Sequence, residues 1–272
     1  MSKTVVITGS TSGIGKELTE QFKKEDFIIF CGYRNKAKLP EQLTDNVIPF
    51  YIDMTDRKSI KEAAEFIKSK AEKVDILINV AGNVVAGPVE LLDTDRLREQ
   101  FDVNVFSHID FSQNLLPVLS NGRIVNISSM SSFGFFPFIS PYCASKRSLD
   151  IFFNAFAVEN HKNIKVISIK PGVISTPIWE KSVESNLKGV SDFGDYEDEL
   201  NFVKNNALRN TNKGLSVQKA AKFIKSVALK KNPKAYYTLG KDAKAAHILS
   251  YLPQDVINKV VKFGLKSRIK KS

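Results

Sequence analysis

Short apolar runs alternate along the chain with longer segments in which apolar residues recur at helical spacing. Two of the runs, at residues 27–33 and 76–79, are apolar on both faces instead of alternating with polar residues. Strands of that kind are typical of parallel sheets covered by helices on both sides. The predicted strands lie at residues 5–8, 27–33, 47–52, 76–79, 123–128, 166–170 and 235–239.

The segments between these runs have the length and the apolar periodicity of helices. We expect helices at residues 13–24, 57–73, 94–116, 142–160, 217–230, 243–250 and 254–266. Regular alternation of strand and helix predicts βαβ units, and hence an α/β fold with a Rossmann-type, doubly wound, seven-stranded parallel sheet and helices on both faces. With 272 residues, the chain is predicted to form a single domain, residues 1–272.

Two segments depart from the regular alternation. Between about residues 176 and 214 the periodicity weakens and polar residues accumulate, which is long for a connection in a compact domain. We interpret this segment as a substrate-binding lid. Residues from about 241 to 272 form a basic C-terminal helical extension.

Composition is that of a globular protein, with 43% hydrophobic and 25% charged residues. The first predicted strand begins almost at Met1, without a segment that resembles a secretory signal, and no apolar stretch is long enough for a transmembrane helix. Cys31 and Cys143 are the only cysteines, and neither a disulfide framework nor a metal site can be built from them. We therefore expect a cytoplasmic protein without a bound metal.

The net charge of +11 comes from the C-terminal part of the chain. In the tail, apolar residues such as Val260 and Phe263 alternate with lysines such as Lys262 and Lys270. This pattern is compatible with weak peripheral contact to an anionic membrane. The alternative, favoured on the sequence alone, is a helix docked through its apolar side with a solvated basic face. Nucleic acid is not an expected partner, because no recognised binding module accompanies the charge.

A glycine-rich turn, Thr8-Gly9-Ser10-Thr11-Ser12-Gly13-Ile14-Gly15, follows the first predicted strand and begins a helix. Such a turn allows close approach of a pyrophosphate and directs N–H groups of the helix N-terminus toward it. A glycine triplet alone also serves plain turn geometry, and the spacing differs from G-x-G-x-x-G. The context favours a nucleotide-binding variant.

Tyr142 and Lys146 are four residues apart on a predicted helix and therefore share one face. A nearby cation favours the phenolate, so we expect Lys146 to lower the pKa of Tyr142 toward the range of a general acid or base. A Tyr/Lys pair at this spacing is usually just a pair of surface neighbours. Ser129 upstream and the glycine-rich turn make a catalytic role more plausible.

The ordered set of motifs resembles the classical short-chain dehydrogenase/reductase family over most of the chain. The motifs are Thr8-Gly-x-x-x-Gly-Ile-Gly15, Asn79-Val-Ala-Gly82, Asn104, Ser129, Tyr142-x-x-x-Lys146 and Pro171-Gly172. The resemblance implies a doubly wound sheet that binds NAD(H) or NADP(H). It also implies that Tyr142 is the acid/base, that Ser129 hydrogen-bonds the substrate oxygen, that Lys146 binds the nicotinamide ribose, and that Asn104 holds a water in the proton relay. Ser128, Ser131 and Ser132 are close competitors for the role of Ser129.

The same resemblance implies a set of cofactor contacts. Asp53 matches an acid that contacts the adenine, and Thr176 lies near the carboxamide. Relatives that prefer NAD have an acid at the position of Tyr33, and none is present here, whereas Arg34 suits a 2′-phosphate. We therefore expect NADP(H) in preference to NAD(H). The expected cofactor-binding residues are Gly9, Ser10, Thr11, Ser12, Gly13, Ile14, Gly15, Arg34, Asp53, Met54, Asn79, Ala81, Gly82, Tyr142, Lys146, Pro171, Gly172, Val173, Ile174 and Thr176.

The substrate side is predicted to be apolar. An aromatic segment with Phe135 and Phe136 lies between Ser129 and Tyr142, and Trp179 lies in the predicted lid. With Ser129 and Tyr142 these residues would bind a bulky hydrophobic alcohol or carbonyl compound, such as a steroid-, retinoid- or lipid-like molecule, although part of the segment could simply pack. Relatives pair the two long helices between subunits, so the resemblance implies a homodimer or homotetramer.

The sequence therefore predicts an NADP(H)-dependent oxidoreductase that interconverts a hydroxyl and a carbonyl. The alternative is a catalytically silent nucleotide-binding scaffold or sensor with a membrane-associating basic tail, which the four retained catalytic residues disfavour. Enoyl reduction is also disfavoured, because relatives with that activity space the tyrosine and lysine more widely.

Overall fold

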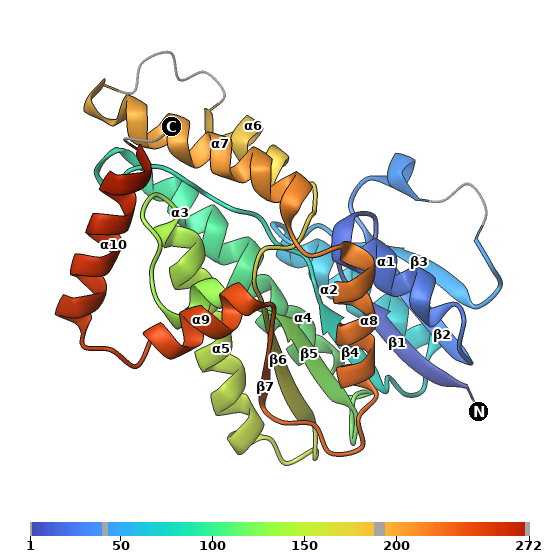
Figure 1. Cartoon of the computed structure of the whole chain (residues 1–272). Coiled ribbons are helices and arrows are strands. Elements are labelled where there is room, and N and C mark those ends of the chain that lie inside the picture. The colour runs from blue at the N-terminus through green and yellow to red at the C-terminus, as the bar shows by residue number, and fades with distance from the viewer. Residues whose placement is uncertain (1, 40–42, 188–193, 270–272) are drawn as a thin grey trace.

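The computed structural model describes residues 2–39, 43–187 and 194–269. Within these ranges, one parallel sheet has the strand order β3-β2-β1-β4-β5-β6-β7 (Figure 1). This confirms the predicted doubly wound, seven-stranded, single-domain fold. The strands are β1 (Lys3–Ile7), β2 (Phe27–Tyr33), β3 (Val47–Tyr51), β4 (Ile76–Asn79), β5 (Arg123–Ile127), β6 (Lys165–Pro171) and β7 (Tyr236–Leu239).

Hydrophobic cores lie on both faces of this sheet, because successive side chains of a strand point to opposite sides. Val5 and Ile7 of β1 belong to the core that also contains Leu18, whereas Val6 between them belongs to the core that contains Phe111. Helices α1 (Gly13–Phe22) and α8 (Val217–Ala228) cover the first core, and α2 (Arg57–Lys70), α4 (Ser107–Leu115) and α5 (Ser140–Glu159) cover the second. The doubly apolar strands thus have the expected cover on each face.

The long helix predicted over residues 94–116 is interrupted. The structure has α3 (Thr94–Phe101), a π-helical turn over Asp102–Phe106, and then α4. A π-turn inserts an extra residue into the helical repeat, and its sequence signature is weak, so periodicity alone missed it. The turn contains Asn104, one of the residues that the sequence motifs singled out.

The segment interpreted as a substrate-binding lid is mostly helical, whereas its weak periodicity predicted a long connection. It contains α6 (Ile178–Leu187) and α7 (Glu197–Lys213), and residues 188–193 of the predicted lid lie outside the described residues. The two helices pack on each other, above the end of the sheet (Figure 1). Their apolar stripes are short, so packing decides their structure more than the local pattern does.

The C-terminal extension forms α9 (Lys241–Leu249) and α10 (Gln254–Ile269), and residues 270–272 lie outside the described ranges. Helix α10 packs against α7, as Figure 1 also shows. In the part of the chain that the structure describes, no helix has the length and hydropathy needed to cross a membrane.

Strand order reverses between β1 and β4, because β1 pairs with β2 on one side and with β4 on the other. The connections that follow these two strands leave toward opposite faces of the sheet. The carboxyl ends of β1 and β4 therefore border a crevice, which is where open α/β sheets bind their ligands.

Candidate active site

The glycine-rich turn is held against the end of β4. Gly9 and Gly13 have φ angles of 62° and 50°, which favour glycine. A Cβ on Gly9 would lie 3.1 Å from the Ala81 backbone. The Thr8 hydroxyl accepts hydrogen bonds from the N–H groups of Val80 at 2.9 Å and Ala81 at 3.2 Å. The turn thus leads directly into α1 with its backbone open to the crevice.

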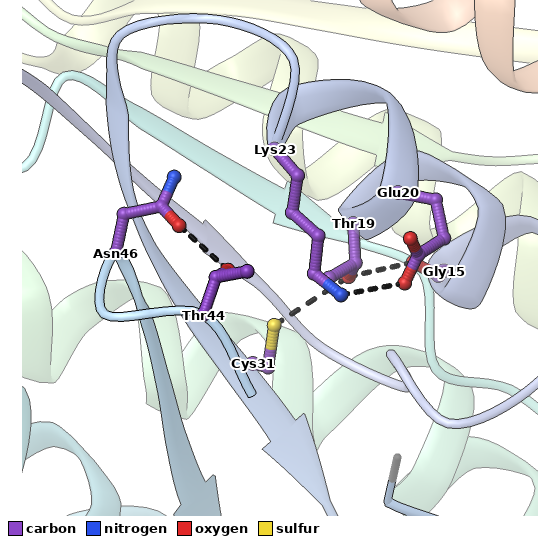
Figure 2. Close-up of polar contacts among 7 residues, drawn as sticks. All are labelled: Gly15, Thr19, Glu20, Lys23, Cys31, Thr44 and Asn46. Carbon is purple, nitrogen blue, oxygen red and sulfur yellow. Dashed lines mark hydrogen bonds and ion pairs between the residues drawn. The ribbon is translucent and has the colours of Figure 1, made fainter. Parts of the chain in front are cut away.

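Other residues of this turn act as its scaffold. The Ser10 hydroxyl donates to the Gly32 carbonyl at 2.8 Å, and Gly15 leaves no room for a side chain, since a Cβ would be 2.3 Å from the Gly9 oxygen. Figure 2 shows the next contact along α1, where the Thr19 hydroxyl donates to the Gly15 carbonyl at 3.0 Å and lies 3.5 Å from the Cys31 sulfur of β2. Ser10 and Gly15 therefore fix the turn without lining the crevice.

A cavity of about 790 Å³ opens between the carboxyl ends of the strands and α6. It brings together most of the residues that the sequence singled out. Those that line it are Gly9, Thr11, Ser12, Gly13, Ile14, Arg34, Met54, Ala81, Gly82, Ser129, Tyr142, Lys146, Pro171, Gly172, Ile174, Thr176 and Trp179.

Ser129 and Tyr142 both line this cavity. Ser129 lies just after β5 and its Oγ accepts from the Ser131 N–H at 3.1 Å, while Tyr142 lies in the first turn of α5. Burial raises the pKa of the Tyr142 phenol to about 12, opposed by its hydrogen bond to Ser129. Of the competing serines, Ser128 also lines the cavity, whereas Ser131 and Ser132 do not.

Lys146, which was expected to lower the pKa of Tyr142, is not among the groups that shift this pKa in the structure. The Lys146 ammonium lies 5.8 Å from the centre of the Tyr142 ring and donates to the Ile127 carbonyl at 2.9 Å. Burial lowers the pKa of Lys146 itself to about 8, and the Asp150 carboxylate raises it. Desolvation is the largest cause of the pKa shift at both groups, and at Tyr142 it favours the protonated phenol.

Asn104 lies behind Lys146 and does not line the cavity. Its Oδ1 accepts from the Asn83 N–H at 3.0 Å, and its Nδ2 donates to the Asn83 carbonyl at 3.1 Å and to the Ser145 hydroxyl at 3.1 Å. A Cβ on Gly82 would approach Asn104 Oδ1 to 3.2 Å, so glycine permits this close packing. The observed contacts make Asn104 a clamp on the segment after β4.

Three further predicted cofactor residues do not line the cavity. Asp53 uses Oδ1 to accept from the Thr55 N–H at 2.9 Å in a local turn. Asn79 is buried and donates to Asn126 Oδ1 at 2.8 Å across β4 and β5. The Val173 N–H donates to the Asp242 carboxylate at 2.7 Å. Each is tied up by a structural contact that the sequence did not reveal.

The aromatic segment that was expected to line the substrate side of the cavity lies outside it. Phe135 and Phe136 do not line the cavity. Neighbouring rings point elsewhere, since Phe133 stacks on His247 of α9 with centroids 4.6 Å apart and Phe138 contacts Tyr196 at 6.3 Å. The aromatic segment therefore connects the catalytic region to the lid and the C-terminal extension.

Several lining residues were missed by the sequence argument. Val84, Val85 and Val103 give the cavity an apolar side, and Lys38 and Lys181 join Arg34 at its mouth. Burial and then the charges of Lys38 and Arg34 lower the pKa of Lys181, so the three cations are near one another. Nothing in the local sequence marked these residues, because they come from separate elements that only the fold brings together.

Another missed residue is His108, which is buried under the cavity. Its Nε2 donates to the Ala81 carbonyl at 2.9 Å, and burial followed by the charge of Lys146 lowers its pKa to about 3. A neutral imidazole therefore helps to fix the segment after β4.

The residues present suit a dinucleotide. Gly13 would carry its Cβ 3.3 Å from Thr176, so its hydrogen keeps the gap between the turn and the lid open, while cations lie at the mouth and Lys146 lies inside. In the ranges that the structure describes, no three His, Cys, Asp or Glu side chains gather to hold a metal ion. The arrangement supports proton transfer beside a bound nucleotide.

Comparisons with known proteins agree with this geometry. The family model described as short chain dehydrogenase matches residues 3–187. The chain is 29% identical to the NADPH-dependent 3-dehydrocapnine reductase of Ornithobacterium rhinotracheale, over 98% of this chain and 99% of that protein. It is 28% identical to the 3-ketodihydrosphingosine reductase of Bacteroides thetaiotaomicron, over 84% of each.

Among solved structures, a short-chain dehydrogenase from Streptomyces avermitilis superimposes with a TM-score of 0.78 at 24% identity and covers 98% of each chain. That likeness concerns the fold. Together with the family match and the grouped Ser129, Tyr142 and Lys146, it shows that this chain belongs to the short-chain dehydrogenase/reductase family of oxidoreductases, which act on CH–OH and C=O groups.

Proposed function

We propose that this protein is an NADP(H)-dependent oxidoreductase that interconverts a hydroxyl and a carbonyl on a bulky hydrophobic substrate, and that it works as a carbonyl reductase at neutral pH. The observation that carries the proposal is that Ser129, Tyr142 and Lys146 line one cavity at the carboxyl ends of the strands, where burial favours the neutral phenol of Tyr142. A phenol with a pKa of about 12 is a proton donor at pH 7, which is the state that carbonyl reduction requires.

When bound, the reduced nicotinamide supplies the hydride. Ser129 and Tyr142 donate hydrogen bonds to the substrate oxygen, and Tyr142 transfers its proton to that oxygen as negative charge develops there. Lys146, held by the Ile127 carbonyl, binds the ribose hydroxyls. Asn104 fixes the backbone of Asn83 beside Lys146.

Preference for the 2′-phosphorylated cofactor rests on charge. Arg34 and Lys38 follow β2, where no acid is present, and Lys181 adds a third cation from α6. A phosphate next to these groups forms charge-assisted contacts that a ribose hydroxyl does not. The similarity to a relative named as NADPH-dependent supports the same choice.

Exchanging this charge gives a direct test of cofactor choice. We expect Arg34→Asp to weaken NADPH binding about a hundredfold and to leave NADH binding within a few-fold, because a carboxylate repels the phosphate and accepts from the ribose hydroxyl. Binding is measured by the quenching of Trp179 fluorescence, with Arg57→Asp on α2 as the matched control. An unchanged NADPH/NADH ratio would refute the assignment.

The substrate class follows from the cavity wall. Val84, Val85, Val103 and Trp179 present apolar surface to the cavity that Tyr142 also lines, which suits an apolar ligand with one polar reacting group. The two relatives named above are reductases of a 3-dehydro and a 3-keto compound. We propose a lipid-like ketone in preference to a sugar.

The experiment is NADPH oxidation with carbonyl compounds of increasing alkyl length. We expect kcat/KM to rise with chain length, since each buried methylene contributes roughly 0.8 kcal/mol. Val85→Asp should abolish this dependence, and Leu91→Asp at an exposed position is the control. If NADPH binds but no carbonyl in the panel is reduced, the scaffold alternative replaces the enzyme.

We also propose that the chain forms a homodimer or homotetramer. Phe106 in the π-turn and Ile151 and Phe152 on α5 are each at least half exposed. Apolar surface of this kind marks a protein interface more often than a solvated face. Sedimentation equilibrium of Ile151→Asp, which should dissociate the assembly, is the test.

A further inference from the structure

Helix α10 carries two apolar stripes, of which only one is used inside the protein. Ile257, Val261 and Leu265 recur at helical spacing and are partly buried, and α10 packs against the lid helix α7. This is the docked side that the sequence analysis favoured for the tail.

The second stripe faces solvent. Val256, Val260 and Phe263 also recur at i, i+4 and i+7, and their exposed fractions are 41%, 50% and 76%. A helix docked on one side is expected to show polar residues on the other. The exposed apolar stripe therefore remains unexplained by the packing of the protein itself.

The end of α9 and the turn that leads into α10 carry further exposed apolar residues. Ile248, Leu249, Tyr251 and Leu252 are all exposed, with fractions between 41% and 76%. Large apolar residues gathered at one place mark a binding surface more often than residues scattered singly do. We call these four residues and the exposed stripe of α10 the C-terminal apolar surface.

Lysines flank this surface. Lys259, Lys262 and Lys266 are exposed on α10, next to Val260 and Phe263 on the helical wheel, and Lys244 is exposed on α9. From residue 241 to the end, eight Lys or Arg residues oppose two acids, Asp242 and Asp255, so 8 − 2 gives +6. A second copy of the same surface would bring these like charges together, which opposes self-association.

We infer that the C-terminal apolar surface is a docking site for an anionic membrane surface, on which α10 lies parallel to the bilayer. Exposed apolar residues enter the boundary between headgroups and acyl chains, and the flanking lysines contact anionic headgroups. Because α10 packs against α7, the membrane lies next to the lid of the active site. The protein lies on the bilayer and does not span it.

The test is flotation of the full-length protein with vesicles of phosphatidylcholine alone or mixed with phosphatidylglycerol. We expect binding to the anionic vesicles that weakens as salt rises, and little binding to phosphatidylcholine alone. Each lysine near an anionic surface is worth about fivefold in binding, so Lys259→Gln/Lys262→Gln/Lys266→Gln should reduce it about a hundredfold.

Two control comparisons distinguish binding through this surface from non-specific attraction of a basic protein to anionic vesicles. Lys58→Gln/Lys61→Gln/Lys70→Gln on α2 removes the same charge from exposed positions elsewhere and should leave binding within a few-fold. Val260→Asp/Phe263→Asp should abolish binding, whereas Val89→Asp/Leu91→Asp, also at exposed apolar positions, should not. Equal losses from both lysine triples would overturn the proposal.

The substitutions in α10 could act only by releasing the helix from α7. A fluorescent reporter variant tests for this. Trp179 is the only tryptophan, so Phe263→Trp adds one emitter at the proposed contact. Its emission should shift to the blue with anionic vesicles, while the unmodified protein should not respond. Absence of the shift overturns the proposal, and so does sedimentation that shows Val260→Asp/Phe263→Asp dissociating an oligomer without any vesicle binding.

This inference does not depend on the proposed function. Oxidation of NADPH with a small water-soluble ketone should be unchanged in every α10 variant, because none of the substituted residues lines the cavity. Failure of vesicle binding with activity retained removes the membrane site alone. Inactivity with vesicle binding retained removes the proposed function alone.

Discussion

At the scale of single residues, the most consequential feature is a line of buried charges behind Tyr142. Lys146 and Asp150 are one turn apart on α5, and the Asp150 carboxylate lies 2.8 Å from the Lys170 ammonium of β6. Lys170 also lies 4.4 Å from the centre of the Phe133 ring. A buried charge without a partner is costly, so Asp150 and Lys170 each depend on the other for a counter-charge.

The first prediction concerns the free energy that the buried Lys146 ammonium costs the folded protein. In the unfolded chain its pKa is 10.5, and burial lowers it to about 8 in the folded protein. Between these values the unfolded state binds more protons, so stability rises with pH across that window and the charge is unfavourable at pH 7. Lys146→Met should abolish activity yet raise the unfolding free energy at pH 7 by about 2 kcal/mol, after allowance for its lost hydrogen bond.

Urea unfolding at pH 7 and pH 10.5 measures this effect, with Lys61→Met at an exposed position of α2 as the control. The stabilisation should shrink at the higher pH. A destabilised Lys146→Met at pH 7 would show that the ammonium contributes favourably to the fold, contrary to its burial.

The second prediction concerns Asp150. Its carboxylate raises the pKa of Lys146, so Asp150→Asn should lower that pKa and move the alkaline decline of kcat/KM below pH 8. The same change leaves Lys170 buried without a counter-charge and should cost about 3 kcal/mol of stability. Asp110→Asn, which removes the charge that pairs with the exposed Arg57, should do neither. A stability loss without any change in the pH profile would limit Asp150 to a structural role.

At the scale of elements, α9 supports the segment after β6. The Asp242 carboxylate accepts from the Val173 N–H at 2.7 Å and from the Ala243 N–H at 2.9 Å. A Cβ on Gly172 would lie 1.9 Å from Asp242 Oδ1, so only glycine permits this contact. The C-terminal extension thereby helps to shape the wall of the cavity.

The third prediction tests this support. Gly172→Ala should weaken NADPH binding by about tenfold, because the added methyl group displaces either Asp242 or the cavity wall. Gly172→Ala/Asp242→Ala should recover part of the loss, since it removes the clash. Isothermal titration calorimetry of both variants and of Gly134→Ala, where a Cβ meets no neighbouring atom, is the measurement. Equal affinity in the Gly172→Ala variant and the unmodified protein would exclude the clash.

The sequence predicted strands more reliably than helix boundaries. Doubly apolar runs such as the one that became β4 have few alternatives to a covered parallel strand. The π-turn at Asn104 and the helices α6 and α7 were missed because they depend on tertiary packing, which local periodicity does not record.

At the scale of the whole molecule, predictions made from motifs placed Ser129, Tyr142 and Lys146 in one cavity, because each motif ends or begins an element at the carboxyl edge of the sheet. Predictions based on closeness to Ser129 in the sequence did not identify the residues that line the cavity. Phe135 and Phe136 are close to Ser129 in sequence but do not line the cavity, whereas Val84 and Lys181 come from distant segments and do. Side-chain direction and burial, which also set the pKa of Tyr142, follow only from the assembled fold.

The central claim is that the neutral Tyr142 phenol donates the proton in carbonyl reduction. Its most direct test is single-turnover NADPH oxidation by Tyr142→Phe beside Tyr237→Phe, a tyrosine on β7 that does not line the cavity. Loss of the proton donor should slow the Tyr142→Phe reaction about a thousandfold, with NADPH affinity within a few-fold and Tyr237→Phe unaffected. Turnover by Tyr142→Phe within tenfold of the unmodified protein would contradict the account.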